Sequence, residues 1–493
     1  MRSSSGWCHV RRATNKGFGS HRLGSVTAPL LLLSFAFAPI ARAQAAHLDE
    51  RVIAADDSTQ SFAQYVPPGY TANRRWPILF VLDPRGRAML ALDLFRPAAE
   101  RLGFVILSSY NSLSDGPPEP NLRAVNAMIA SAQSRLSIDT RRFYFAGFSG
   151  TARAALEFAL ELRGHFAGVL ADGAAVGFAP NGIEMTFAGD STFAYFAATG
   201  TADFNHEEVR AAVERMRLSR VPNRLTIFAG PHSWPPEEIC ARALDWFQLR
   251  AMVSGLAPLD SSWMRARLAA DLASAEQFDR TGQWDDARRL FRAIAQDFAA
   301  WPDARDAGAR AEAIAQRPAF RRYEDERRKV ADADERQAAD LQRALAWARQ
   351  QRSPPPLDAL EDKLGIRALQ QQIAHGDSVE AASATRLLAR VSVFVAFYEP
   401  RTYLAAHDAP RALRMLEVAA AISPLRGESC PLLREAVSAA TPDQRQFFSA
   451  QCSVTSPASV LRDARAQTRT GTPLRERDFK SLASTRFATR AVN

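Results

Sequence analysis

At 493 residues the chain is longer than one hydrophobic core normally organises, so we expect at least two domains. Its 47% hydrophobic and 23% charged residues describe an ordinary globular protein. The formal net charge of +9 would suit a nucleic-acid-binding protein, but six of the basic residues belong to the first 43 residues, which contain no acid. Much of the remaining excess lies in the tail between Arg462 and Arg490, so nucleic-acid binding is not expected.

Residues 1–43 are predicted to be a secretory signal peptide. A basic segment precedes the apolar run 28–38, and Ala41-Arg42-Ala43 provides an A-x-A cleavage pattern before Gln44. The apolar run is shorter than the roughly 20 residues that a membrane-spanning helix needs, and no other segment is predicted to cross a membrane. We therefore expect an exported, soluble, periplasmic protein.

Apolar runs alternate with helical segments between residue 51 and about residue 250. Strands are expected at 61–66, 77–82, 104–107, 143–146, 166–170, 192–198 and 225–228. Helices are expected at 97–101, 122–134, 153–162, 206–217 and 236–249. The alternation predicts a doubly wound, mostly parallel sheet with helices on both faces, forming a domain over 44–254. In such sheets the chemistry lies at the carboxyl ends of the strands.

The segment Gly255-Leu256-Ala257-Pro258 ends the alternation, and no strand is predicted beyond it. Two later segments have the residue spacing of tetratricopeptide helix pairs. The first contains Ala275, Phe278, Gly282, Trp284, Ala287, Phe291 and Ile294, and the second contains Tyr403, Ala412, Leu416, Ala419 and Pro424. We predict an all-α, tetratricopeptide-like domain over 255–424, which could bind a protein partner; ordinary amphipathic helices are the alternative. Residues 425–493 are predicted to form a helical segment and a basic, solvated tail.

Three cysteines remain after the leader. Cys430 and Cys452 flank a short helical segment and could pair in an oxidising compartment, with two free thiols as the alternative. Cys240 would then be single, as a small apolar residue within a helix.

The most informative stretch is 143–151, where an apolar run ends in Gly147-Phe148-Ser149-Gly150 and a helix-forming segment follows. A strand, a sharp turn carrying a serine and a helix form a nucleophile elbow. The start of the helix directs its positive dipole end and free N–H groups, including that of Gly150, toward an oxyanion formed at Ser149. Thr151 replaces the second glycine that usually follows the serine in this motif.

A nucleophilic serine needs a base, and the base needs an orienting acid. His232 follows the last predicted strand and is the expected base, with a structural histidine as its alternative role. His165 is interpreted as structural, and His206 lies near the start of a predicted helix. Asp203 follows the penultimate strand and is the expected acid, with a helix N-cap as its alternative role. Asp172, after the strand before that one, is the alternative acid.

The three motifs Gly147-Phe148-Ser149-Gly150, Gly200-Thr201-Ala202-Asp203 and Gly230-Pro231-His232-Ser233-Trp234 resemble those of the α/β-hydrolases, nearest the dienelactone hydrolase and polyhydroxybutyrate depolymerase-like esterases. The resemblance covers about 200 residues. It implies a Ser-Asp-His serine hydrolase that cleaves small or polymeric carboxylic esters without a metal or cofactor.

The sequence departs from that family after the second predicted apolar strand, where Leu82-Asp83-Pro84-Arg85 stands in place of His-Gly. A backbone N–H of this loop should complete the oxyanion hole with Gly150. Since Pro84 has no N–H, Arg85 is the expected second donor. Asp83 and Arg85 could also pair with each other or with an acidic group of a substrate.

The two strands near Val169 and Phe193 are separated by only about twenty residues, too few for a large helical lid, so an open cleft is expected. Two other functions are compatible with these motifs. One is a peptidase or another acyl hydrolase with the same triad. The other is a catalytically idle hydrolase fold that binds a partner through its helical repeats.

Overall fold

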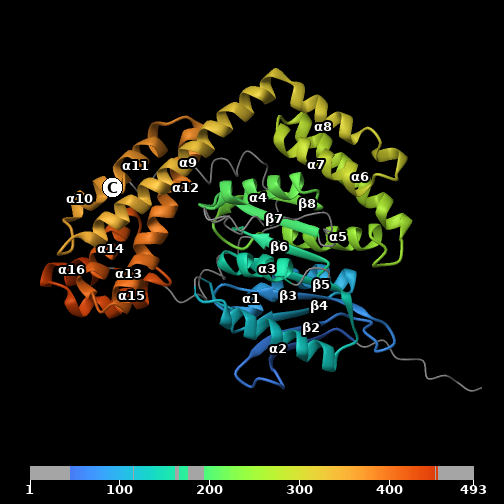
Figure 1. The fold of residues 1–493 in the computed structure, drawn as a ribbon, viewed down its shortest axis with the longest axis horizontal. Coiled ribbons are helices and arrows are strands. Elements are labelled where there is room, and N and C mark those ends of the chain that lie inside the picture. The colour runs from blue at the N-terminus through green and yellow to red at the C-terminus, as the bar shows by residue number, and fades with distance from the viewer. Residues whose placement is uncertain (1–44, 115, 162–165, 176–193, 450, 453–493) are drawn as a thin grey trace, which may run out of the picture. The chain divides into compact units, whose positions relative to one another are not determined.

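The computed structural model describes residues 45–114, 116–161, 166–175, 194–449 and 451–452, so the predicted signal peptide and most of the basic tail lie outside it. Its centre is an eight-stranded sheet with the order β1-β2-β4-β3-β5-β6-β7-β8 (Figure 1). The strands are β1 His47–Ile53, β2 Ser61–Val66, β3 Trp76–Leu82, β4 Val105–Ser109, β5 Ile138–Phe148, β6 Gly168–Asp172, β7 Ala194–Ala202 and β8 Asn223–Pro231.

The sheet is mostly parallel, as the alternating pattern predicts. β2 runs antiparallel to both β1 and β4, and the pairings from β4 through β3, β5, β6 and β7 to β8 are all parallel. Every residue of β3 and β6 is buried, which explains why β3 is apolar throughout and why β6 is apolar up to Asp172 at its end. β1 was not predicted from the sequence. It is an edge strand with a single buried residue, Val52, and therefore has no apolar run.

Helices cover both faces of the sheet. α1 (Ala88–Leu102) and α5 (Glu237–Val253) contribute to one hydrophobic cluster, and α2 (Glu119–Arg135), α3 (Gly150–Glu161) and α4 (His206–Leu218) contribute to a second cluster on the other face. The predicted start of the first helix at Pro97 is wrong. Pro97 lies inside α1, whose preceding turns carry the buried residues Ala91, Leu92 and Phe95.

The described residues beyond β8 form helices and turns, without a strand. After α5 these are α6 Ser261–Arg280, α7 Trp284–Asp297, a 3-10 turn at Pro302–Ala304, α8 Ala307–Gln316, α9 Pro318–Gln350, α10 Leu357–Lys363, α11 Ile366–His375, α12 Ser378–Val393, a π-helical turn at Phe394–Tyr398, α13 Glu399–Ala405, α14 Ala409–Ile422, α15 Ser429–Ala436, a 3-10 turn at Val437–Ala439 and α16 Pro442–Ser449.

The first of these helices pack on the α/β sheet. Phe291 and Ile294 of α7 belong to the same hydrophobic cluster as Tyr144 of β5. The interface also contains an ion pair between Arg224 of β8 and Asp297 of α7, at 2.8 Å. Residues between 341 and 448 form a separate hydrophobic cluster. Helices α6 and α7 contact each other, as do α13 and α14, but a tetratricopeptide character of these pairs stays a prediction.

One stretch of the described chain, Val379–Ala405, is long and apolar enough to cross a membrane by length and composition, with a mean hydropathy of 1.2 in its most apolar window. No such segment beyond the leader was predicted from the sequence. In the structure this stretch is built from α12, the π-helical turn and α13, and it contains buried charges that are paired. Arg386 lies 3.1 Å from Asp334, and Glu399 pairs with Arg349, so both ends of the stretch pack against α9.

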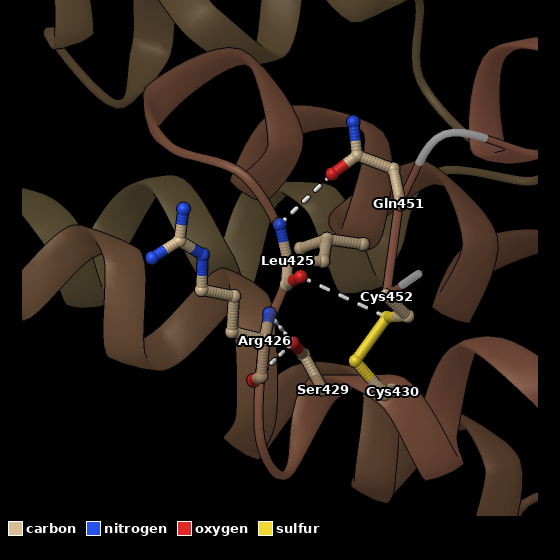
Figure 2. The surroundings of a disulfide bond; sticks show 6 residues. All are labelled: Leu425, Arg426, Ser429, Cys430, Gln451 and Cys452. Carbon is tan, nitrogen blue, oxygen red and sulfur yellow. Dashed lines mark hydrogen bonds between the residues drawn. A yellow bond between two sulfur atoms is a disulfide. The ribbon is translucent and has the colours of Figure 1, made fainter. Parts of the chain in front are cut away.

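Cys430 and Cys452 form a disulfide with a Cα–Cα distance of 5.6 Å, which decides between the two alternatives left open by the sequence (Figure 2). Nearby, the Leu425 N–H donates to the side-chain oxygen of Gln451 at 2.9 Å. The Ser429 hydroxyl accepts from the Arg426 N–H and lies 2.9 Å from the Arg426 carbonyl oxygen. The loop that precedes α15 is thus held at several points.

Cys240 is a buried free thiol in α5, as expected.

Candidate active site

Ser149 lies between β5 and α3 with a φ of +57°, a left-handed conformation that non-glycine residues rarely adopt. Its N–H donates to the carbonyl oxygen of Asp172 at the end of β6, at 2.8 Å. A Cβ atom at Gly147 would come 2.3 Å from the Thr151 carbonyl oxygen, so only glycine fits before the turn. The strained serine and the crowded glycine are the features of a nucleophile elbow.

Thr151 departs from the usual motif, and the structure shows what its side chain does. It is fully buried, and its hydroxyl oxygen lies 2.6 Å from the carbonyl oxygen of Leu82 at the end of β3. The same hydroxyl accepts a hydrogen bond from the Phe148 N–H at 3.2 Å. Thr151 therefore ties the elbow to the neighbouring strand, a contact that a glycine could not make.

Ser149, His232 and Asp203 form a continuous hydrogen-bonded chain. The Nε2 atom of His232 lies 2.9 Å from the Oγ of Ser149, and its Nδ1 lies 2.9 Å from Oδ1 of Asp203. Since a carboxylate only accepts, Nδ1 carries the proton and Nε2 is left to accept from the serine hydroxyl. The three side chains come from the turn after β5, the turn after β7 and the end of β8, which neighbouring parallel strands bring to one edge of the sheet.

Two aromatic rings hold the imidazole of His232. The ring of Phe204 lies 4.2 Å from it between centroids, and that of Phe148 lies 4.6 Å from it. Asp203 is fully buried, and its Oδ1 also accepts from the Asn205 N–H at 2.8 Å. The base and its acid are thus both held in place by neighbouring groups.

The alternative acid, Asp172, is not bonded to His232. Its side chain is fully buried, and neither of its oxygens has a hydrogen-bond partner among the described residues. Burial, and to a lesser extent the charge of Asp203, raises the pKa of Asp172 well above its usual range.

The other two histidines considered from the sequence do not join this chain. The ring of His206 is buried, and its Nδ1 donates to the carbonyl oxygen of Gly200 at 2.9 Å, so its role is structural. His165 lies outside the described residues.

The loop after β3 differs from the sequence expectation. The Arg85 N–H, the predicted second oxyanion donor, donates to Oδ1 of Asp83 at 2.9 Å and is therefore used within its own loop. The Asp83 carboxylate pairs with the guanidinium of Arg87 at 2.8 Å, not with the side chain of Arg85. The side chain of Arg85 pairs with Glu428 instead.

Asp83 also links this loop to the loop of the catalytic histidine. The indole N–H of Trp234 donates to Oδ2 of Asp83 at 2.8 Å. Burial opposes the charged form of Asp83, but hydrogen bonds from Arg87 and Trp234 outweigh it and lower the pKa of the carboxyl group. Neither partner of Asp83 was predicted from the sequence, although Trp234 belongs to the histidine motif.

Ser149 and His232 open into a cavity of about 800 Å³. One wall comes from the α/β region, including Pro84, Leu113 and Trp234. The other wall comes from the helical region: Ser392, Val393, Ala396, Phe397, Tyr398, Arg401, Arg426, Glu428 and Ser429. The open cleft was expected from the segment between β6 and β7 alone, and the wall from the helical region was not predicted.

Among the described residues, no cluster of three or more His, Cys, Asp or Glu side chains could hold a metal ion.

The strand order, the antiparallel β2 and the serine elbow are those of the α/β-hydrolase fold.

No protein-family model matches the chain, and no curated protein matches it. Among solved structures, a ferulic acid esterase is 13% identical and covers 42% of this chain and 99% of its own, with a TM-score of 0.34.

Two S-formylglutathione hydrolases are similar to the same extent. That of Staphylococcus aureus is 11% identical, covering 41% of this chain and 98% of its own with a TM-score of 0.31. That of Agrobacterium tumefaciens is 15% identical, covering 42% and 94% with a TM-score of 0.33. These similarities are too distant to indicate a substrate, and they leave more than half of the present chain unmatched.

Proposed function

We propose that this protein is an exported serine hydrolase that cleaves carboxylic esters through Ser149, His232 and Asp203. The observation that carries the proposal is the hydrogen-bonded chain from the strained Ser149 through His232 to the buried Asp203, with 2.9 Å at each step. Each group has the partner its role requires: a base for the nucleophile and an acid that orients the base.

In the proposed mechanism the Ser149 Oγ attacks the ester carbonyl carbon while Nε2 of His232 takes the hydroxyl proton. The tetrahedral oxyanion collapses, the alcohol leaves with the proton from His232, and an acyl group remains on Ser149. Water then attacks the acyl carbon with His232 again as the base, and the carboxylic acid is released. Asp203 keeps the imidazole in the tautomer that this sequence needs and stabilises its charged form.

Gly150 at the start of α3 is proposed as the first oxyanion donor, because the opening N–H groups of a helix have no acceptor within it. Arg85 is proposed as the second donor. Its N–H would have to release the carboxylate of Asp83 and donate to the oxyanion instead.

The leader, with its cleavage pattern before Gln44, supports export to the periplasm. The paired helices α6/α7 and α13/α14 are proposed as a surface for a protein partner.

A fluorophosphonate tests the proposal without knowledge of the natural substrate. It should attach covalently to Ser149 in the folded mature protein, and Ser149→Ala should abolish labelling. Turnover of p-nitrophenyl esters, compared with the corresponding anilides, separates an esterase from a peptidase. A folded protein that is neither labelled at Ser149 nor active on any ester would be an idle hydrolase fold, and the proposal would be wrong.

A further inference from the structure

The charges that line the catalytic cavity are unbalanced. Its lining contains four arginines and one glutamate. Arg87 is paired with Asp83, and Arg85 is paired with Glu428. The remaining two, Arg401 and Arg426, have no carboxylate partner among the described residues, although each faces the same cavity as Ser149.

Both unpaired arginines stand on well-supported backbone. Arg426 belongs to the loop before α15, which the Cys430–Cys452 disulfide and the hydrogen bonds of Ser429 hold in place (Figure 2). Arg401 lies in α13, and its guanidinium is 5.8 Å from the ring centroid of Phe397, another residue of the cavity wall. A guanidinium whose backbone is fixed loses less freedom on binding an anion than one on a mobile loop.

The rest of the lining near the reacting atoms is apolar and aromatic. The rings of Phe148 and Phe204 pack against His232, and Trp234 packs against Phe148. Phe397 lines the same cavity from the helical region. A ligand that fills this cavity would place apolar groups beside the triad and meet positive charge at the helical wall. A neutral ester leaves both guanidinium groups without a counter-charge, whereas an ester with an anionic group supplies one.

We propose that Arg401 and Arg426 form an anion-binding subsite, and that the protein prefers esters carrying a carboxylate or a similar anionic group in addition to the ester bond. The inference rests on the proposed hydrolysis at Ser149 and names its substrate class. Because both arginines are exposed to solvent, the preference should weaken as salt is raised.

Two matched pairs of chromogenic esters test the subsite in the mature full-length protein. In one pair, p-nitrophenyl butyrate is compared with its analogue that carries a ring carboxylate ortho to the nitro group. In the other, p-nitrophenyl hexanoate is compared with the mono-p-nitrophenyl ester of adipic acid, so that the charge is on the acyl side. After correction for the hydroxide reactivity of each ester, kcat/KM should favour the anionic member of at least one pair.

The variant Arg401→Gln/Arg426→Gln should lower the ratio of anionic to neutral kcat/KM by about tenfold or more, as expected for lost hydrogen bonds to a charged group. Arg401→Lys/Arg426→Lys should retain part of the ratio, because the charge remains. Arg135→Gln removes an exposed arginine of α2 far from the cavity lining and should leave the ratio unchanged.

Binding to the Ser149→Ala variant, measured by calorimetry with the same esters, separates this inference from the hydrolysis itself. Tighter binding of the anionic member, lost in the Arg→Gln double variant, would support the subsite even if no ester were turned over. A ratio near one for both pairs, or a preference that survives the double Gln variant, would overturn it.

Discussion

The guanidinium of Arg390, in α12 of the helical region, donates a hydrogen bond to the backbone carbonyl of Phe204, directly after the proposed acid Asp203. The ring of Phe204 lies 4.2 Å from the imidazole of His232 between centroids. One side chain of the helical region therefore contacts the turn that carries the acid and supports the base.

We expect Arg390→Ala to lower kcat by about ten- to a hundredfold, because small displacements of catalytic groups are costly. Arg390 is interpreted as a positioning residue, so the pH profile of kcat/KM should also shift as the imidazole loses its fixed environment. Arg390→Lys keeps a donor and a charge and should recover part of the activity. An unchanged kcat and pH profile in folded Arg390→Ala would show that the contact has no catalytic role.

Asp203→Asn should reduce kcat by several orders of magnitude, since an amide can stabilise the wrong tautomer of His232. Asp172→Asn should be mild, because the carboxyl group of Asp172 makes no hydrogen bond to His232 and an amide has nearly the same shape. Steady-state kinetics on a p-nitrophenyl ester compares the two. A crippled Asp172→Asn together with a mild Asp203→Asn would move the acid to Asp172.

Phe291→Ala should lower the free energy of unfolding by about 3–5 kcal/mol, the usual cost of emptying a buried aromatic site. Phe291 is fully buried in α7, with the guanidinium of Arg310 at 4.2 Å from its ring centroid. Because its cluster continues into the α/β sheet, the hydrolase region should be destabilised together with α7. Denaturant unfolding measures the loss, and Phe278→Ala, at a partly buried neighbour, is the control that should cost less.

His206 should make the protein sensitive to mild acid. Burial, followed by the nearby charge of Arg210, lowers the pKa of His206 from 6.5 to about 3, so the native ring stays neutral. The unfolded chain therefore binds a proton at this histidine below pH 6.5, whereas the native protein does not. The contribution of neutral His206 to the free energy of unfolding is complete above pH 6.5, and it is lost by about 1.4 kcal/mol per pH unit as the pH falls from 6.5 toward 3.

Denaturant midpoints at several pH values between these limits test this sensitivity. His206→Asn keeps a donor for the Gly200 carbonyl oxygen but cannot be protonated, so its stability should depend less steeply on pH. Equal slopes for the wild type and the variant would show that another group dominates the response to acid.

The sequence alone determined those features of the fold and of the site that depend on residues close together in the chain. Contiguous apolar runs predict the buried strands, because a strand covered on both faces has no polar side. The elbow at Ser149 was readable since its strand, turn and helix are consecutive. The places of Asp203 and His232 followed from counting strands, because parallel strands end at one edge of the sheet.

The tertiary structure alone decided the contacts between distant segments. The indole N–H of Trp234 donates to the carboxylate of Asp83, which stands 151 positions earlier in the chain, and no local pattern indicates this contact. The contact of Arg390 with Phe204 and the place of Arg426 in the cavity likewise arise from how the helices pack on the sheet. Such packing is the sum of many weak contacts between segments far apart in sequence, so it leaves no periodic signal in the sequence.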